Sequence, residues 1–137
     1  MKMHVTGQQV ARVIELAKNY RGYPYDLCVQ DIIKDLASGQ YQPNPAYAAL
    51  CTYLEGLGYE AVLDIEALMD YGGELISYTL DPEPLSLCYE YMQVQYGGNK
   101  GDISLAIQYI AGKLNLPERL EAALDDVDLA EDGYVCF

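Results

Sequence analysis

The sequence contains no tryptophan, one phenylalanine and one histidine, and its four cysteines form no CxxC pair. A Ser or Cys nucleophile needs a neighbouring base, most often histidine, and His4 stands at an N-terminus that we expect to be exposed and frayed. Structural zinc needs four Cys or His ligands in paired spacing. We therefore predict no catalytic residue, no metal site and no cofactor.

Long apolar runs are also missing from the sequence. No segment approaches the roughly 18 apolar residues of a membrane span, and the first residues lack the apolar core of a secretory signal. These absences favour a cytoplasmic protein. In that compartment we expect the cysteines to be reduced thiols, since a chain of 137 residues can build a core without disulfides.

Positive charge is scarce and unevenly placed. Eight basic residues oppose 21 acidic ones, which gives a formal net charge of −13. Residues 1–34 carry five bases and three acids, whereas residues 35–137 carry three bases and eighteen acids. No Lys or Arg occurs between Lys34 and Lys100. Such a field repels phosphate backbones and anionic lipid and attracts basic surfaces, so we expect neither direct nucleic-acid binding nor membrane binding. Charge that serves only solubility is the competing interpretation.

Apolar residues recur at helical intervals along most of the chain. Thr6 and Gln9 have the spacing of a capping box at the first helix. Asn44-Pro45 combines a cap with proline at the first helical position, and Gly72-Gly73 is placed to end the fourth helix. The predicted helices cover about 7–19, 26–38, 45–57, 59–70, 81–96, 103–110 and 116–124.

Little of the sequence is typical of β-structure. Residues 75–80 are the most strand-like piece, and only the tail 134–137 is similarly apolar. We expect 75–80 to be irregular or a weak strand. The predicted fold is an all-α, compact bundle of about six or seven short helices with at most one minor strand pair, and residues 1–137 form a single domain.

Two stretches, PAYAALCTYLEGLGYEAVLDIEALMDYGG and AIQYIAGKLNLPERLEAAL, resemble a small uncharacterised bacterial helical domain family of unknown function. They cover about a third of the chain. The family usually has Trp-Leu-Gly-Arg-Gly at the turn where this sequence has Met69 to Gly73. The resemblance implies an all-α fold and no particular activity.

Other motifs carry no chemistry. The acidic tail 126–137 departs from a calcium loop, because its glycine falls at the eighth position and Phe137 stands where a bidentate Glu is needed. The loop 97–101 has a lysine but lacks the P-loop pattern, so we interpret it as an interhelical connection. An enzyme that uses a pair of carboxylates stays an open alternative, because any two of the twenty-one acidic residues could form the pair. The sequence does not indicate which two they would be.

The acidic residues and the tyrosines are the remaining features of the sequence. Tyr53, Tyr91 and Tyr109 lie on apolar stripes and are predicted core residues, whereas most of the fourteen tyrosines lie at helix ends, on polar faces or in loops. On the helix 59–70 the acids recur four residues apart, without a base, opposite the apolar stripe. The predicted partner-binding residues are Glu55, Glu60, Asp64, Glu66, Asp70, Tyr71 and Glu74.

We therefore expect a non-enzymatic acidic protein that occupies a basic site on a protein partner. A nucleic-acid mimic of the anti-restriction or anti-CRISPR type is one form of such an inhibitor, because spaced carboxylates can imitate a phosphate backbone. The alternative is a helical scaffold or self-associating module without a small-molecule site. Neither hypothesis names the partner or the oligomeric state.

Overall fold

The computed structural model describes residues 3–21, 37, 45–77, 84–96, 103–113, 115–129 and 135–136. In this part of the chain the protein is an all-α bundle, as the sequence predicts. The predicted helix 26–38 and the loop 97–101 lie outside the described residues. The helices are α1 (Gly7–Arg21), α3 (Pro45–Leu57), α4 (Tyr59–Ile76), α5 (Leu85–Tyr96), α6 (Ser104–Ala111) and α7 (Leu116–Asp126).

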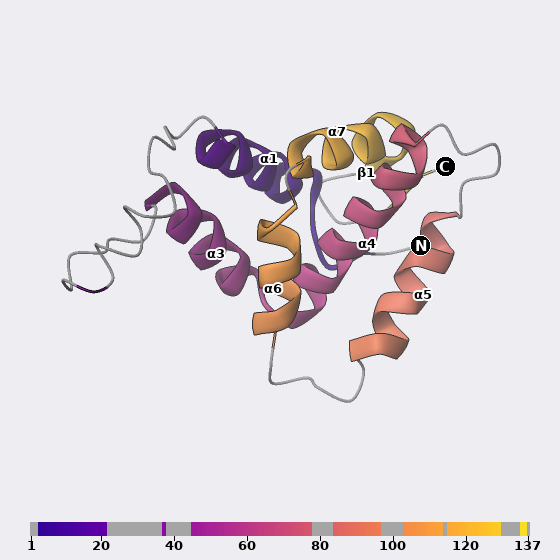
Figure 1. The fold of residues 1–137 in the computed structure, drawn as a ribbon. Helices are drawn as coiled ribbons and strands as arrows, with labels where there is room; N and C mark the ends of the chain where they lie inside the picture. The colour runs from indigo at the N-terminus through magenta and orange to yellow at the C-terminus, as the bar shows by residue number, and fades with distance from the viewer. Residues whose placement is uncertain are drawn as a thin grey trace.

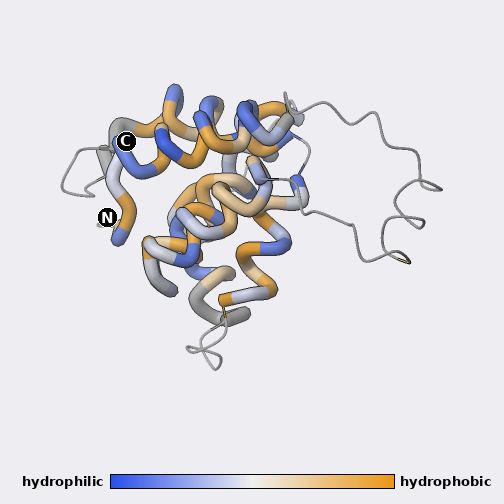
Figure 2. The backbone as a smooth tube through the Cα atoms, turned by 90° about the vertical axis from the view of Figure 1, so that its left-hand side faces the viewer, coloured by the Kyte–Doolittle hydropathy of each residue, from blue (hydrophilic) through white to orange (hydrophobic). Residues whose placement is uncertain are grey.

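Helix α4 is the centre of the bundle. It contacts α3, α5, α6 and α7, and α1 packs in turn on α3 and α7. Figure 1 shows α4 between α5 on one side and α6 and α3 on the other, with α1 and α7 across its upper end. Apolar and polar residues alternate along the helices in Figure 2, as amphipathic helices require. The buried apolar residues form one core cluster.

The central position of α4 overturns one expectation. Every residue from Ala61 to Met69 is buried, including Asp64 and Glu66, which have 0% and 2% of their surface exposed. The predicted solvent-facing row of acids on this helix is therefore wrong at these two positions. A periodic apolar stripe shows that one face of a helix is covered, but it does not show whether neighbouring helices also cover the other.

Gly72-Gly73 does not end α4, contrary to the prediction, because the helix continues to Ile76. A Cβ on Gly72 would lie 1.7 Å from the backbone oxygen of Arg119, and one on Gly73 would lie 2.0 Å from Nη1 of the same residue. The two glycines therefore permit close contact between α4 and α7. Residues 75 and 76, predicted to be irregular or strand-like, belong to the same helix.

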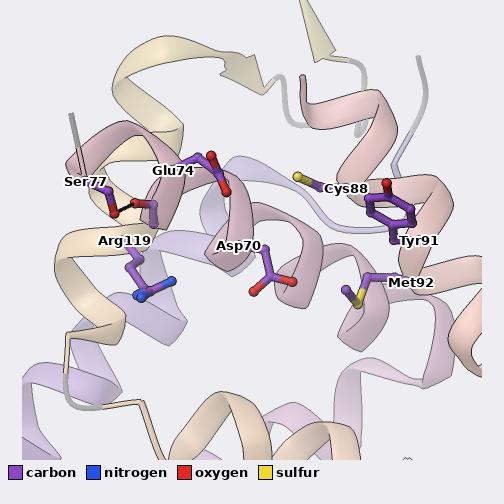
Figure 3. A pocket seen from close by; sticks show the side chains of 8 residues that line it. Asp70, Glu74, Ser77, Cys88, Tyr91, Met92 and Arg119 are labelled. Carbon is purple, nitrogen blue, oxygen red and sulfur yellow. Dashed lines mark hydrogen bonds between the residues drawn. The ribbon is translucent and has the colours of Figure 1, made fainter. Parts of the chain in front are cut away.

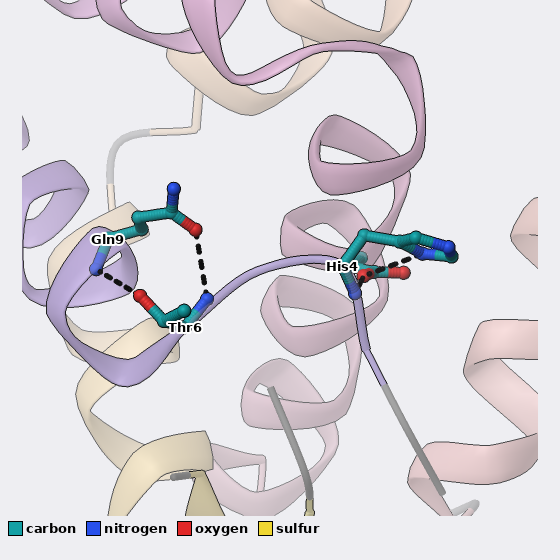
Figure 4. A network of polar contacts seen from close by, with 4 residues as sticks. His4, Thr6 and Gln9 are labelled. Atoms are coloured by element: carbon teal, nitrogen blue, oxygen red, sulfur yellow. Dashed lines mark hydrogen bonds and ion pairs between the residues drawn. The ribbon is translucent and has the colours of Figure 1, made fainter. Parts of the chain in front are cut away.

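The start of α1 matches its sequence signature. The Thr6 backbone amide donates to Oε1 of Gln9 over 2.9 Å, and the Gln9 amide donates to Oγ1 of Thr6 over 3.2 Å. This reciprocal pair satisfies amides that a helix N-terminus otherwise leaves without partners, and Figure 4 shows it beside the segment that leads into α1. The predicted capping box is confirmed.

The strand pair differs from the sequence prediction in its partners. Strand β1 (Asp128–Leu129) pairs antiparallel with β2 (Val135–Cys136), so the tail folds back on the end of α7. The tail therefore finds its partner a few residues away along the chain rather than in residues 75–80. Between α3 and α4 the chain turns at Gly58, whose φ of 93° lies in the region that favours glycine.

Candidate functional site

A pocket of about 280 Å³ opens where α4, α5 and α7 meet. Figure 3 shows its side chains, which come from the end of α4, from α5 and from α7. Charged, aromatic and sulfur-bearing groups meet here. The lining residues are Asp70, Gly73, Glu74, Ser77, Cys88, Tyr91, Met92 and Arg119.

Asp70 and Glu74 supply the negative charge of the pocket. They are four residues apart on α4, so their side chains are neighbours one turn apart on the same face. Burial raises the pKa of the Asp70 carboxyl and Glu74 raises it further, whereas the cations Lys113 and Arg119 lower it. Asp70 is therefore a partly desolvated carboxylate that a further cation would stabilise.

Arg119 supplies the positive charge, and its place follows from the glycines of α4. Its Nε donates to Oδ1 of Asn115 over 2.8 Å, which fixes the guanidinium beside its own helix. Its Nη1 lies against Gly73, where any larger residue would collide with it. No carboxylate of the described residues forms an ion pair with Arg119 within 4 Å.

Helix α5 forms the apolar wall of the pocket. The Cys88 side chain is buried, and Met92 is 7% exposed. Tyr91 is 52% exposed and Tyr109 on α6 is 43% exposed, so their prediction as core residues is wrong, whereas Tyr53 packs partly buried against the core. At the mouth of the pocket Ser77 Oγ donates to the Gly73 carbonyl over 2.7 Å and closes the end of α4.

The structure separates the seven predicted partner-binding residues into three groups. Asp70 and Glu74 line the pocket. Glu55 and Glu60 are exposed at the junction of α3 and α4. The remaining three, Asp64, Glu66 and Tyr71, are buried.

Tyr71 is held in the interior by its hydroxyl group. The hydroxyl donates a hydrogen bond to Oδ2 of Asp126 at the end of α7. Burial raises the pKa of Tyr71 to about 12, and the neighbouring Asp126 carboxylate contributes to the rise. Tyr71 therefore joins α4 to α7 and presents no surface to a partner, contrary to its prediction as a binding residue.

Asp64 binds the N-terminal segment. Its Oδ2 accepts a hydrogen bond from the His4 backbone amide, and His4 Nδ1 lies 3.4 Å from the same oxygen (Figure 4). Burial raises the pKa of Asp64 to about 6, and the contacts with His4 and with the Val5 amide oppose this rise. Met3 and Val5 are fully buried on either side of the exposed imidazole. The expectation of a frayed terminus at His4 is therefore wrong.

Sequence reasoning did not find the other pocket residues. Arg119, Tyr91, Met92, Cys88 and Ser77 come from three different segments, and no spacing in the sequence relates them. The adjacent glycines of α4 were the one available signal, because paired glycines inside a helix mark a close approach as well as a helix end.

The described ranges contain neither a cluster of metal-ligating side chains nor a membrane-spanning helix. No group of three or more His, Cys, Asp or Glu side chains there could hold a metal ion. Among the same residues, no helix has the length and apolar character needed to cross a bilayer.

The fold and the pocket together define an all-α bundle with a charged surface pocket at the meeting of three helices. No family model, curated protein or solved structure matches the chain. The resemblance of its two helical stretches to an uncharacterised bacterial family therefore stays a prediction.

Proposed function

We propose that the protein is a non-enzymatic acidic binding protein that occupies a basic site on a protein partner. The observation that carries this proposal is the pocket, where Asp70 and Glu74 open to solvent without an ion-pair partner within 4 Å among the described residues. The described bases of α1, by contrast, are paired, Arg12 with Glu15 and Lys18 with Glu121. Carboxylates without a direct ion pair attract a basic partner and form charge-assisted hydrogen bonds with it.

Two acidic sites lie along α4, and they define the face that we propose binds the partner. Glu60, together with Glu55 at the end of α3, lies at the start of α4, and Asp70 and Glu74 lie near its other end. The ten residues from Glu60 to Asp70 correspond to about 15 Å of helix. Separate acidic sites at this distance can contact different basic residues of a nucleic-acid-binding groove, which is how a nucleic-acid mimic of the anti-restriction or anti-CRISPR type would act.

The placement of the carboxylates favours binding over catalysis. Asp70 and Glu74 do line one pocket, but they stand side by side on one helix rather than facing each other across a bound substrate. The only histidine of the chain is engaged with Asp64 and is not part of the pocket lining. The pocket lining therefore holds no histidine, the base most often paired with a Ser or Cys nucleophile such as Ser77 or Cys88.

Salt-dependent capture tests this proposal. The immobilised protein is offered basic nucleases and other nucleic-acid-binding proteins at rising NaCl, with duplex DNA as a competitor. We expect capture that weakens steeply with salt and that DNA competes away. Glu55→Gln with Glu60→Gln should weaken capture more than the control Glu15→Gln with Glu121→Gln, which removes equal charge from α1 and α7. Capture that changes neither with salt nor with added DNA would refute the proposal.

The second candidate is a self-associating helical module, and α6 carries the observation that favours it. Leu105 is 66% exposed and Tyr109 is 43% exposed, one turn apart on the same face. Apolar residues grouped on a surface are often buried in an interface. Light scattering would detect an oligomer that Leu105→Glu dissociates if this face is used, and a monomer at all concentrations would remove this candidate.

A further inference from the structure

The pocket between α4, α5 and α7 offers three different surfaces to a ligand. Helix α4 contributes the carboxylates Asp70 and Glu74, α5 contributes the Tyr91 ring and the Met92 thioether, and α7 contributes Arg119 (Figure 3). Its volume of about 280 Å³ lies just below the range of small-molecule sites, which is roughly 300–1,000 Å³. The pocket is therefore suited to one side chain of a partner.

The two carboxylates of the pocket have no cation within ion-pair distance among the described residues. Arg119 in the lining and Lys113 outside it act on Asp70 only at longer range. The guanidinium of Arg119 is held by Asn115 on the α7 side, which leaves the carboxylates of α4 open to a direct ion pair with a ligand. Burial already raises the pKa of Asp70, and a bound cation would favour the ionised form that burial disfavours.

The shape of the walls distinguishes between the two kinds of basic side chain. A guanidinium is planar, can bond two carboxylate oxygens at once and stacks on aromatic faces, whereas a lysine ammonium is a strongly hydrated point charge. Tyr91 is 52% exposed at the wall of the pocket, which leaves its ring available for stacking. Asp70 and Glu74 of α4 line the same pocket.

We propose that this pocket binds an arginine side chain of the basic partner. Its guanidinium bonds Asp70 and Glu74 and stacks on the ring of Tyr91. The inference rests on the proposed function, because it names the group of the partner that the acidic face recognises.

Peptides of equal charge and different basic side chain test this inference. Octa-arginine and octa-lysine are titrated into the protein by calorimetry at low and moderate salt. We expect the wild-type protein to bind octa-arginine about fivefold more tightly, the size of one exposed cation–π contact. In the double variant Asp70→Asn with Glu74→Gln, the two affinities should become equal.

Two further variants separate the pocket from net charge. The double variant Glu15→Gln with Glu121→Gln removes the same charge on α1 and α7, so it should weaken both peptides alike and keep the preference for arginine. Tyr91→Leu replaces an exposed side chain and leaves every charge in place. It should lower the preference even if the Asp70 and Glu74 variant does not fold, which circular dichroism would reveal.

The outcomes distinguish the inference from the proposed function. Equal wild-type affinity for the two peptides, or a preference that survives both the carboxylate variant and Tyr91→Leu, overturns the arginine pocket and leaves the acidic binding function standing. If neither peptide binds at any salt concentration, the proposed function fails, and the pocket assignment fails with it.

Discussion

Asp64 and His4 join the N-terminal segment to the centre of the bundle. The carboxylate of Asp64 is fully buried, and the His4 amide donates to it. Few of the described titratable groups lie around this carboxylate. They are His4 on the N-terminal side and Tyr89 on α5, and the pKa of Tyr89 is raised by burial and by the charges of Asp64 and Glu60. A buried carboxylate with so few donors costs stability when it ionises.

This cost has a defined pH range. The pKa of Asp64 rises from 3.8 to about 6 on folding, so the folded protein binds more protons than the unfolded chain between these values. Stability from this group is therefore full below pH 4 and falls as the pH rises to about 6. Asp64→Asn keeps an acceptor for the His4 amide without a charge.

We expect the Asp64→Asn variant to be more stable than the wild type at pH 7 by about 2–3 kcal/mol, because one pKa unit corresponds to about 1.4 kcal/mol. The two proteins should converge near pH 4. Urea denaturation at pH 4, 5, 6 and 7 measures the difference, and the comparison cancels the titration of the other carboxylates. A variant that is less stable at pH 7 would show that the ionised Asp64 and His4 form a net favourable pair.

At the scale of residues, the sequence indicated part of the pocket lining. Asp70 and Glu74 were predicted as binding residues because acids without a neighbouring base recur around α4, and they do line one pocket. Asp64 and Glu66 have the same chemistry and the same sequence surroundings, yet they are buried. Only the packing of neighbouring helices separates the two pairs, and sequence periodicity carries no information about which helix covers which face.

At the scale of elements, the boundary between α4 and α7 depends on two residues without a side chain. Gly72 faces the backbone of Arg119, and Gly73 faces its guanidinium. Glycine inside a helix costs about 1 kcal/mol relative to alanine. We infer that the close contact between α4 and α7, together with the Tyr71–Asp126 hydrogen bond, offsets that cost.

Alanine substitution tests this role of the glycines. In Gly72→Ala the new methyl group would lie 1.7 Å from the Arg119 carbonyl oxygen, so the helices must move apart. We expect a loss of about 3 kcal/mol, at the upper end of overpacking, because the obstacle is backbone. The loss would appear as a lower midpoint of urea denaturation.

Gly56→Ala is the matched control, since nothing lies within 4 Å of its added Cβ and the residue is helical. It should raise stability by up to about 1 kcal/mol. Equal effects of the two substitutions would contradict the close-contact interpretation.

Prediction of the elements succeeded where signals are local. The capping box at α1 and the Pro at the start of α3 specify helix starts through contacts within a few residues. The predicted end of α4 was wrong because a Gly-Gly pair is typical both of helix ends and of close helix contacts. Only the tertiary contact with Arg119 decides between the two. The pairing of β1 with β2 was missed for a similar reason, since two-residue strands leave almost no pattern in the sequence.

At the scale of the whole molecule, a net charge of −13 acts against the compact state as well as in favour of partners. Ion pairs with Arg12 and Lys18 relieve Glu15 and Glu121, whereas Glu55 and Glu60 are exposed with no ion-pair partner in the described ranges. Glu55 and Glu60 are therefore among the carboxylates whose repulsion no ion pair relieves, and we propose that they bind a basic partner.

Added salt should stabilise the protein by screening this repulsion. The Debye length falls from about 30 Å at 0.01 M to about 8 Å at 0.15 M salt, so charges on opposite sides of the bundle cease to interact. We expect thermal unfolding at pH 7 to shift upward by a few degrees over this range, which corresponds to about 1 kcal/mol. Chloride salts are used, because sulfate strengthens apolar burial in addition.

Two variants of equal net charge locate the source of the effect. Glu55→Gln with Glu60→Gln removes carboxylates without a cation, so it should raise the unfolding temperature at low salt and reduce the response to salt. Glu15→Gln with Glu121→Gln removes the partners of Arg12 and Lys18, so it should raise the unfolding temperature less, or lower it. Identical curves would mean that net charge alone sets the stability. Different curves in the expected order would mean that the unrelieved charge on the α4 side carries a stability cost, which a basic partner would remove on binding.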